Sequence, residues 1–364
     1  MRKGIHLYRL ILCAVLAFGT CSNSRTIAQS QINTDNSSLF PIQVSDKWGY
    51  IDRTGKMVIE PRFDNPSWAP PYFCEGLALV QIGDILTGKS GYIDETGEYV
   101  VEPIFDIAAP FSEGLAAVGI GDYDTGKNGY IDKQGKYFIA PQFDAGYSFS
   151  EGLACVRIGY LGKWGYIDKT GKYIIEPQFD DGCAFSEGLA RVRIGDMKTG
   201  KWGYIDKKGE YVITPQFDWA EDFSEGLALV KNGNHYSFID KTGKAVITPQ
   251  CESASSFSDG LASITVGTFQ DSKSGYIDKT GKYVIDPQYN ATWDFREGLA
   301  LVRILDKGAY KYGFIDKTGK YVIEPICDSA KMFKDGLALV VIGNEYGYID
   351  KTGTFVWKKE KLNE

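Results

Sequence analysis

Short stretches of alternating apolar and polar residues recur along almost the whole chain, separated by turns that contain glycine. The clearest copy is KWGYIDKTGKYIIEPQFD, residues 163–180. A period of two predicts β-strands, here at residues 164–168 and 173–176. The Asp-Lys-Thr-Gly between them predicts a tight turn, because aspartate accepts backbone N–H bonds and glycine adopts positive φ. Pro177 has no N–H to donate, so we expect the second strand to end before it.

A third strand is predicted at residues 189–194, followed by a hairpin that leads to the next copy at Trp202. The turn aspartate marks nine copies, at Asp52, Asp94, Asp132, Asp168, Asp206, Asp240, Asp278, Asp316 and Asp350. Their spacing of 34 to 42 residues is typical of solenoids, propellers and other arrays. We therefore expect an all-β fold, a tandem array of about nine three-stranded antiparallel β-meander repeats. It would form either a closed propeller-like toroid or an open β-solenoid.

The two ends of the pattern leave closure open. Residues 40–44 take the place of a third strand before the first copy, and the chain stops after two strands of a ninth unit, at residue 357. These pieces would together complete a unit, as closure requires, because closure removes both sheet edges. The alternative is an array that starts and stops within a unit, its edges protected by Pro41 or by the charged tail.

Apart from one insertion at residues 65–71, changes in length are confined to one type of connection. The distance from the turn aspartate to the following proline is 9 residues in all eight complete units. The length of the hairpin from the third strand to the next first strand changes only by even numbers of residues, which keeps every side chain on its face of the sheet. Its tips are long at residues 83–90, 121–128, 195–201, 266–274 and 304–312, and short at 231–236 and 342–346. Variable loops on a constant scaffold predict a binding surface along this rim.

The first residues resemble an export signal. Arg2, Lys3 and Arg9 precede an apolar run at residues 10–18, which is too short to span a hydrocarbon core of about 30 Å. We expect a signal peptide at residues 1–28, a polar leader at 29–39, the array at 40–357 and a charged tail at 358–364. The mature protein would be periplasmic or secreted. Lipidation at Cys21 and a cytosolic apolar N-terminal helix are the alternatives.

The net charge bears on the class of partner, and the cysteine content bears on disulfide bonding. The net charge is −7, and residues 1–28 carry four basic residues and no acid, so the mature chain would carry −7 − 4 = −11. This balance argues against nucleic acid or anionic lipid. Five cysteines would remain, an odd number at scattered positions, which is no disulfide framework. Cys251 and Cys327 replace a repeated phenylalanine and are interpreted as apolar fillers.

The repeated Lys-Trp-Gly-Tyr-Ile-Asp, the following Gly-Lys-Tyr-Ile/Val-Ile-x-Pro-Gln-Phe-Asp and Phe-Ser-Glu-Gly-Leu-Ala together resemble the WG-repeat proteins of bacteria. The resemblance covers residues 40–357. It implies a β-repeat protein of the envelope or the exterior and brings no catalytic residue with it. Ser237 replaces the glycine once, and the tryptophan is replaced at Ser90, Asn128, Tyr236, Ser274, Tyr312 and Tyr346.

Several residues could carry chemistry, and each has a simpler interpretation. Residues 83–90 match the phosphate-loop pattern, but they lie in a predicted hairpin and not between a strand and a helix. The acids of the acid-Gly pairs recur eight times, which favours a turn element over a glycosidase pair. Residues 122–124 lack the oxygen ligands of a full calcium loop. His235 alone cannot form a multi-histidine metal site and is expected to be exposed.

The aromatic residues divide into two positions. The tyrosine of the first strand is aromatic in all nine units and is expected to pack in the core. The neighbouring tryptophan position varies and is expected to be half exposed. Candidate ligand contacts are Trp48, Trp68, Trp164, Trp202, Trp219 and Trp293, with packing between repeats as the alternative.

These observations predict a protein that is not an enzyme and needs no cofactor. The leading hypothesis is an exported scaffold, monomeric, that presents its variable hairpin tips to an envelope or extracellular protein. The alternative is a carbohydrate or cell-wall binding module that uses the partly exposed tryptophans. A hydrolase would need one unit with an unusual cluster of acids, and none stands out.

Overall fold

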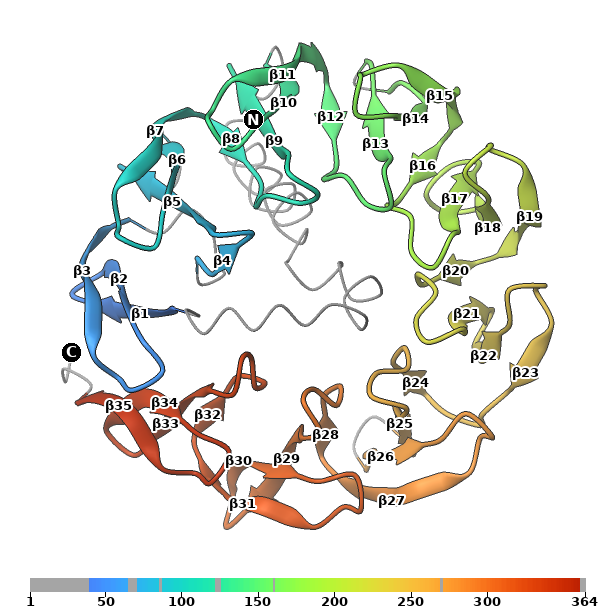
Figure 1. Cartoon of the computed structure of the whole chain (residues 1–364). Helices are drawn as coiled ribbons and strands as arrows, with labels where there is room; N and C mark the ends of the chain where they lie inside the picture. Colours follow the sequence, from blue (N-terminus) through green and yellow to red (C-terminus); the bar gives the residue numbers. More distant parts are fainter. Residues whose placement is uncertain are drawn as a thin grey trace, which may run out of the picture. The chain divides into compact units, whose positions relative to one another are not determined.

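The computed structural model describes residues 39–64, 71–84, 87–121, 126–159, 161–268 and 271–360. Every regular element in these ranges is a β-strand, and the strands form nine antiparallel sheets in chain order (Figure 1). The prediction of an all-β tandem array is confirmed. No helix in the described ranges is long and apolar enough to cross a membrane.

The strands of the first five sheets are β1 (Phe40–Val44), β2 (Lys47–Ile51), β3 (Met57–Phe63); β4 (Phe73–Cys74), β5 (Leu77–Ile82), β6 (Lys89–Ile93), β7 (Tyr99–Phe105); β8 (Ile107–Ala108), β9 (Ala116–Ile120), β10 (Lys127–Ile131), β11 (Tyr137–Phe143); β12 (Ala145–Gly146), β13 (Ala154–Arg157), β14 (Trp164–Ile167), β15 (Tyr173–Phe179); β16 (Asp181–Gly182), β17 (Ala190–Ile194), β18 (Lys201–Ile205), β19 (Tyr211–Phe217).

The strands of the last four sheets are β20 (Trp219–Ala220), β21 (Ala228–Asn232), β22 (His235–Ile239), β23 (Ala245–Ile247); β24 (Ser253–Ala254), β25 (Ala262–Val266), β26 (Lys273–Ile277), β27 (Tyr283–Tyr289); β28 (Ala291–Thr292), β29 (Ala300–Asp306), β30 (Ala309–Ile315), β31 (Tyr321–Cys327); β32 (Ser329–Ala330), β33 (Ala338–Ile342), β34 (Glu345–Ile349), β35 (Phe355–Glu360).

Each sheet after the first consists of a two-residue strand followed by three longer ones, as in the order β12-β13-β14-β15. This is the four-stranded meander used in β-propeller blades. The short strand was not predicted from the sequence, because two residues carry no detectable alternation. The sheets also group the strands differently from the predicted units. Strands joined by tight hairpins pair, so β1 pairs with β2 and β35 with β34, and neither end of the array is left as half a unit.

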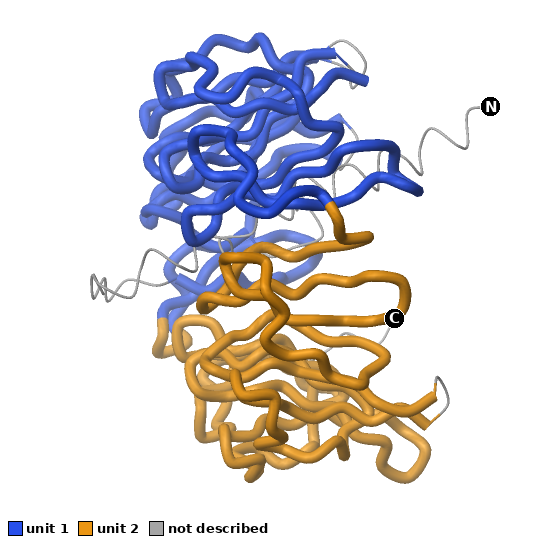
Figure 2. Tube along the Cα trace, turned by 90° about the vertical axis from the view of Figure 1, so that its right-hand side faces the viewer, with its two compact units in different colours: residues 1–52, 56–215 blue, residues 53–55, 216–364 orange. Residues whose placement is uncertain are grey.

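The chain divides into two compact units, residues 1–52 with 56–215 and residues 53–55 with 216–364 (Figure 2). Unit 2 thus includes the first turn of the array. In unit 2, Gly55 of that turn lies against Val356 of β35, and Gly353 lies against Ile323 of β31. The turn of the first repeat therefore rests on the last strand in the way that later turns rest on the strand of the preceding sheet. Strand β35 itself continues to Glu360, three residues into the predicted tail.

The last strand of most sheets does not end at its proline, contrary to expectation. Strand β15 runs from Tyr173 to Phe179 and includes Pro177. Tyr166 pairs with Ile175 and Trp164 with Phe179, so two extra residues of β15 form a bulge where proline needs no ladder partner. A Cβ on Gly165 would lie 2.7 Å from the Ile175 carbonyl oxygen and 2.8 Å from the Pro177 nitrogen. The glycine of the Trp-Gly-Tyr motif is therefore required by the bulge opposite it.

The sixth sheet shows what happens without this glycine. Ser237 takes its place in β22, and strand β23 ends at Ile247, before Pro249. The ladder between β22 and β23 is limited to the pairs Phe238–Ile247 and Ile239–Ala245. The serine fits because the bulge is absent.

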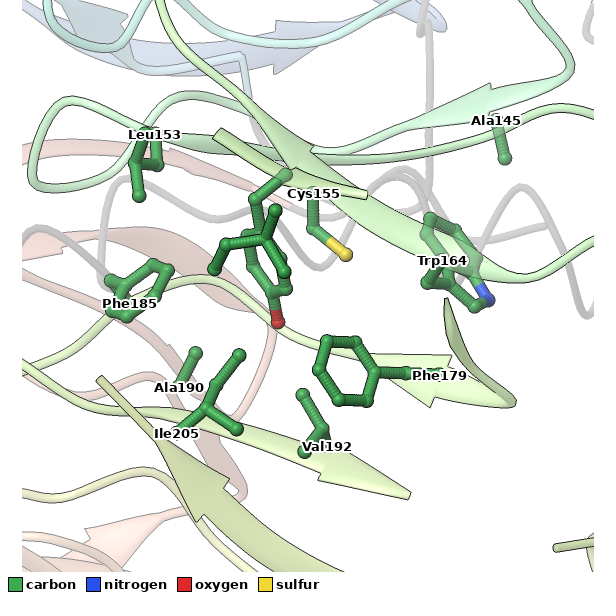
Figure 3. Close-up of a cluster of buried hydrophobic side chains, with 11 residues drawn as sticks. Ala145, Leu153, Cys155, Trp164, Phe179, Phe185, Ala190, Val192 and Ile205 are labelled. Carbon is green, nitrogen blue, oxygen red and sulfur yellow. The ribbon is translucent and has the colours of Figure 1, made fainter. Parts of the chain in front are cut away.

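The hydrophobic core lies between consecutive sheets. In unit 1, Cys155, Trp164 and Phe179 of the fourth sheet face Ala190, Val192 and Ile205 of the fifth (Figure 3). The tyrosine position is buried in every sheet, as predicted, in Tyr50, Tyr92, Tyr130, Tyr166, Tyr204, Phe238, Tyr276, Phe314 and Tyr348. In Tyr50, Tyr92, Tyr130, Tyr166 and Tyr276 the hydroxyl donates to a backbone carbonyl of the segment that leads into or through the next sheet, as from Tyr130 to the Tyr147 carbonyl at 2.8 Å.

The turn that holds the acid-Gly pair also joins neighbouring sheets. Glu113 has φ of 54° and Gly114 of 84°, as in a type I′ turn. The Glu113 carboxylate accepts the N–H of Gly152 in the next sheet at 3.0 Å and lies 3.4 Å from the Lys169 Nζ. Equivalent contacts link Glu75, Gly114 and Lys133; Glu151, Gly188 and Lys207; Glu225, Gly260 and Lys279; and Glu297, Gly336 and Lys351. The repeated acids are turn elements, as predicted.

The cysteines serve packing. Cys327 is fully buried and Cys251 is half-buried, both at the phenylalanine position. Burial raises the pKa of each of these two thiols to about 11, so they stay protonated at neutral pH. Among the described residues, Cys155, Cys183, Cys251 and Cys327 form no disulfide bond.

Candidate functional site: the variable hairpins

The hairpin between the second and third strand has the same base in five of the described sheets. In the fifth sheet, the Asp180 carboxylate accepts a bond from the Lys163 Nζ at 2.6 Å and from the Gly195 N–H at 2.8 Å. These two bonds hold the pKa of Asp180 below its ordinary value. The same arrangement joins Lys47, Asp64 and Gly83; Lys89, Asp106 and Gly121; Lys127, Asp144 and Gly159; and Lys311, Asp328 and Gly343. Each of these hairpins is thus fixed at its first residue to the strand of the preceding sheet.

Beyond this base the hairpins expose apolar side chains. Met197 is 92% exposed and Leu161 is 91% exposed, at the tips of the fifth and fourth sheets. In the eighth sheet, Leu305 is 55% and Tyr310 is 50% exposed. That hairpin is the predicted long tip at residues 304–312, and it is a continuous ladder closed by the pair Asp306–Ala309. The predicted rim therefore exists as short, anchored projections with apolar ends.

A row of side chains crosses each sheet at the foot of its hairpin. We call it the hairpin row: the tryptophan position of the third strand, its partner on the second strand, and the opposite residue of the short strand. Residues of similar size pair across it in four sheets. Arg157 pairs with Trp164 and Lys231 with Tyr236, whereas Gly119 pairs with Asn128 and Thr265 with Ser274. In these sheets a large residue at the tryptophan position therefore has a large cross-strand neighbour, and a small residue has a small one.

Five of the six predicted ligand contacts are described, and they lie in or directly after strands of five different sheets. Trp48 and Trp164 are only 5% and 8% exposed, so the half-exposed position expected from the sequence is core in these sheets. Trp164 stacks on Tyr147 with ring centroids 5.2 Å apart and lies under the Arg157 guanidinium at 5.1 Å. Trp202, Trp219 and Trp293 are half-buried. Trp68 lies outside the described residues.

The three half-buried tryptophans each belong to an aromatic and cationic cluster that the sequence reading missed. Trp202 has the guanidinium of Arg193 at 5.7 Å. Trp219 stands opposite Lys231, whose Nζ lies 4.7 Å from the Tyr236 ring centroid. Trp293 lies 5.7 Å from Tyr312. A basic residue two positions before the hairpin glycine was the available signal, as in Arg157 before Gly159 and Arg193 before Gly195.

The remaining candidates have structural roles. His235 is exposed in its short hairpin, as expected. In the phosphate-loop match, Lys89 is in β6 and pairs with Asp106 at 2.6 Å, and residues 85–86 lie outside the described part. The acids of the 122–124 segment also lie outside it. Among the described residues, no group of three or more His, Cys, Asp and Glu side chains could hold a metal ion.

Comparisons with known proteins place the chain by its repeats. A family model described as "WG containing repeat" matches residues 48–84, 91–123, 129–161, 164–197, 202–236, 236–267, 275–307 and 312–346. No curated protein matches the chain.

Solved structures are similar in fold alone. A crystal structure of a eukaryotic initiation factor is 14% identical with a TM-score of 0.62, over 89% of this chain and 96% of that one. A tricorn protease crystal structure is 12% identical with a TM-score of 0.28, over 89% of this chain and 39% of that one. The first likeness shows a shared fold.

Proposed function

Because the chain belongs to the WG-repeat family, we propose that it is a non-enzymatic, exported binding scaffold that presents its variable hairpins to a protein partner. The observation that carries this proposal is the pairing of a fixed base with an apolar tip. Asp180 anchors the hairpin that carries Met197, a side chain 92% exposed to solvent. An anchored loop loses little conformational entropy on binding, so more of its contact energy is available for affinity.

The exposed side chains are of the kind found in protein interfaces. Met, Tyr and Trp are enriched in interface cores, where they bury large apolar area. The tips supply Leu161 and Met197 in unit 1, and Leu305 and Tyr310 in unit 2. Charged residues surround them, as in Lys198 next to Met197 and Asp306 next to Leu305. An apolar centre with a charged rim supports a partner that dissociates and rebinds, as soluble proteins do.

Exchange of hairpin tips tests this function. We would replace residues 195–201 and 304–312 with the short tip of residues 231–236, and capture partners from an envelope extract. We expect the captured proteins to change, while a variant altered in the constant turn, Thr170→Ser, captures the wild-type set. An unchanged set of partners for the exchanged tips would argue against the hairpins as the binding surface.

Export is the second part of the proposal and rests on the basic residues Arg2, Lys3 and Arg9 before an apolar run. We expect the mature chain to begin at Gln29 in the periplasm or the medium. Mass spectrometry of the protein from fractionated cells measures this directly. A diacylated N-terminal Cys21 would instead make it a lipoprotein, and an intact Met1 in the cytosol would contradict export.

Carbohydrate binding is the second candidate, and the sixth sheet favours it. Trp219 and Tyr236 are half-buried on either side of Lys231, at a hairpin of minimal length. Aromatic rings stack on sugar faces, and half-buried rings keep the orientation that stacking needs. A glycan array with the wild type and Trp219→Ala and Trp202→Ala variants tests it. Absence of binding to every glycan would remove this candidate.

A further inference from the structure

The hairpin of the eighth sheet carries an arginine that lies over an aromatic ring, in a row with two further aromatic residues. Strands β29 and β30 pair from Ala300 to Ile315 and place Arg303 opposite Tyr312. The Arg303 guanidinium carbon lies 4.2 Å from the Tyr310 ring centroid, and the Trp293 ring centroid lies 5.7 Å from that of Tyr312. Arg303 is half-buried, whereas Tyr310 and Leu305 reach solvent.

The same position in the fifth sheet shows what is missing. There Arg193 donates to the Gly195 carbonyl at 3.0 Å and pairs with Asp181 at 3.3 Å. The carboxylate of Asp180 lies close enough for the charge of Arg193 to contribute to lowering its pKa. The charge of Arg193 is therefore neutralised within its own hairpin row and base.

Both acids are absent around Arg303. Ala291 stands opposite Arg303 on the short strand, where Asp181 stands opposite Arg193. Asn290 replaces Asp180 at the hairpin base and keeps the backbone contact, accepting the Leu305 N–H at 2.8 Å. The Arg303 Nε is buried without a hydrogen-bond partner among the described residues. A buried donor of a charged group without a partner is costly, so a group from outside would gain most by supplying one.

We propose that Arg303, with Tyr310 and Tyr312, is the docking point for a carboxylate of an acidic segment in the partner protein. This rests on the proposed function and names the chemistry of the partner. A guanidinium binds a carboxylate through two parallel N–H bonds, and partial burial strengthens them. Arg, Tyr and Trp are the residues that dominate binding energy in protein interfaces.

A protein segment fits this hairpin better than a sugar does. Arg303 already covers one face of the Tyr310 ring, the surface on which a pyranose would stack. Leu305 adds an apolar side chain 55% exposed beside it, which an apolar residue next to the acidic one would cover. The expected ligand is thus an extended or loop segment with an aspartate or glutamate flanked by apolar residues.

A random peptide display library, panned on the full chain, provides the probe. We expect selected peptides to be enriched in Asp or Glu beside apolar residues. For a synthetic peptide from this selection, fluorescence anisotropy should show a loss of about 10- to 100-fold in affinity for Arg303→Gln, with partial recovery in Arg303→Lys. Arg193→Gln is the matched control, because that arginine is satisfied internally, and it should leave the affinity unchanged.

A second pair of variants keeps the arginine and restores the missing acids. Asn290→Asp and Ala291→Asp should neutralise the charge of Arg303 and lower the affinity for the peptide by a similar factor. These variants test the proposal even if Arg303→Gln fails to fold. Equal affinity in wild type and these variants would overturn the proposal, as would selected peptides without acids or no selection at all. If peptide binding is lost only on exchange of residues 195–201, the docking point is wrong but the scaffold function stands.

Discussion

The two ends of each sheet differ in their contacts with the neighbouring sheets. At the end with the acid-Gly turn, Glu113 binds the Gly152 N–H and Lys169, so three turns of two sheets are joined by side chains that hardly vary. At the hairpin end, the base formed by Lys163, Asp180 and Gly195 has equivalents in four other hairpins, and the length and sequence of the tips beyond it differ between sheets. The contacts that hold neighbouring sheets together therefore lie mainly in the core and at the end with the acid-Gly turns. The sequence at the other end can vary without breaking them.

The largest effect should come from the constant framework between the two ends. Gly165→Ala places a Cβ 2.7 Å from the Ile175 carbonyl oxygen, and backbone on both sides of the bulge cannot move apart cheaply. We expect a loss of about 2–4 kcal/mol in the free energy of unfolding, measured by urea denaturation.

Ser237→Gly is the matched control for this glycine. The sixth sheet has no bulge opposite the serine, so the variant should change stability by less than about 1 kcal/mol. Equal losses for the two variants would mean that the bulge does not explain the glycine.

The next largest effect should come from the turn contacts. Glu113→Ala removes the acceptor of the Gly152 N–H and the partner of Lys169, and we expect a loss of about 1 kcal/mol. The Glu113 side chain is 22% exposed, which keeps the value low. Glu113→Gln should lose only about half as much free energy of unfolding as Glu113→Ala, because its amide oxygen still accepts the N–H. If the alanine variant unfolds at the wild-type urea concentration, this end does not hold the sheets together.

Much of the fold followed from period-two alternation and from the regular spacing of the turn aspartates, which predicted the strands around Asp168. The bulge could not be predicted in this way, because proline at position 177 normally signals the end of a strand. Only the pairing of Trp164 with Phe179 shows that the strand continues past the proline. The variable tryptophan position suggested exposure, yet Trp164 is core. It packs against Tyr147 and its cross-strand partner Arg157, and pairing across strands cannot be read before the register is known.

The site was predicted in outline only. The even-stepped hairpins located the rim, and the exposure of Met197 agrees with that expectation. The contrast between Arg193 and Arg303 was not visible, because it depends on Asn290 and Ala291, which are distant from Arg303 in the chain and meet it only in the folded sheet.

A smaller effect should appear on acidification. The bond from Lys127 and the N–H of Gly159 hold the pKa of Asp144 below its ordinary value of 3.8. A lowered pKa in the folded state adds stability above the pKa of the unfolded chain, and this stability is lost as pH falls through the folded value. The melting temperature should therefore drop below about pH 4.

Asp144→Asn tests that assignment. Both partners are partly exposed, so the variant should lose about 0.5 kcal/mol at pH 7 and show a flatter decline below pH 4. A decline as steep as that of the wild type would assign the acid sensitivity to other carboxylates, such as the turn aspartates.

The smallest effect on stability should come from the tips, and it sets the hairpin end apart from the rest. Met197→Ser alters a side chain that is 92% exposed and touches little of the sheet, so urea unfolding should shift by less than about 0.5 kcal/mol. Because the Asp180 base remains, the hairpin should keep its position, and capture of partners from an envelope extract should still weaken. Ile194→Ser, at the foot of the same hairpin and 40% exposed, is the control that should cost more stability. If Met197→Ser destabilises the chain as much as Ile194→Ser, the tip belongs to the framework and is not free to specify a partner.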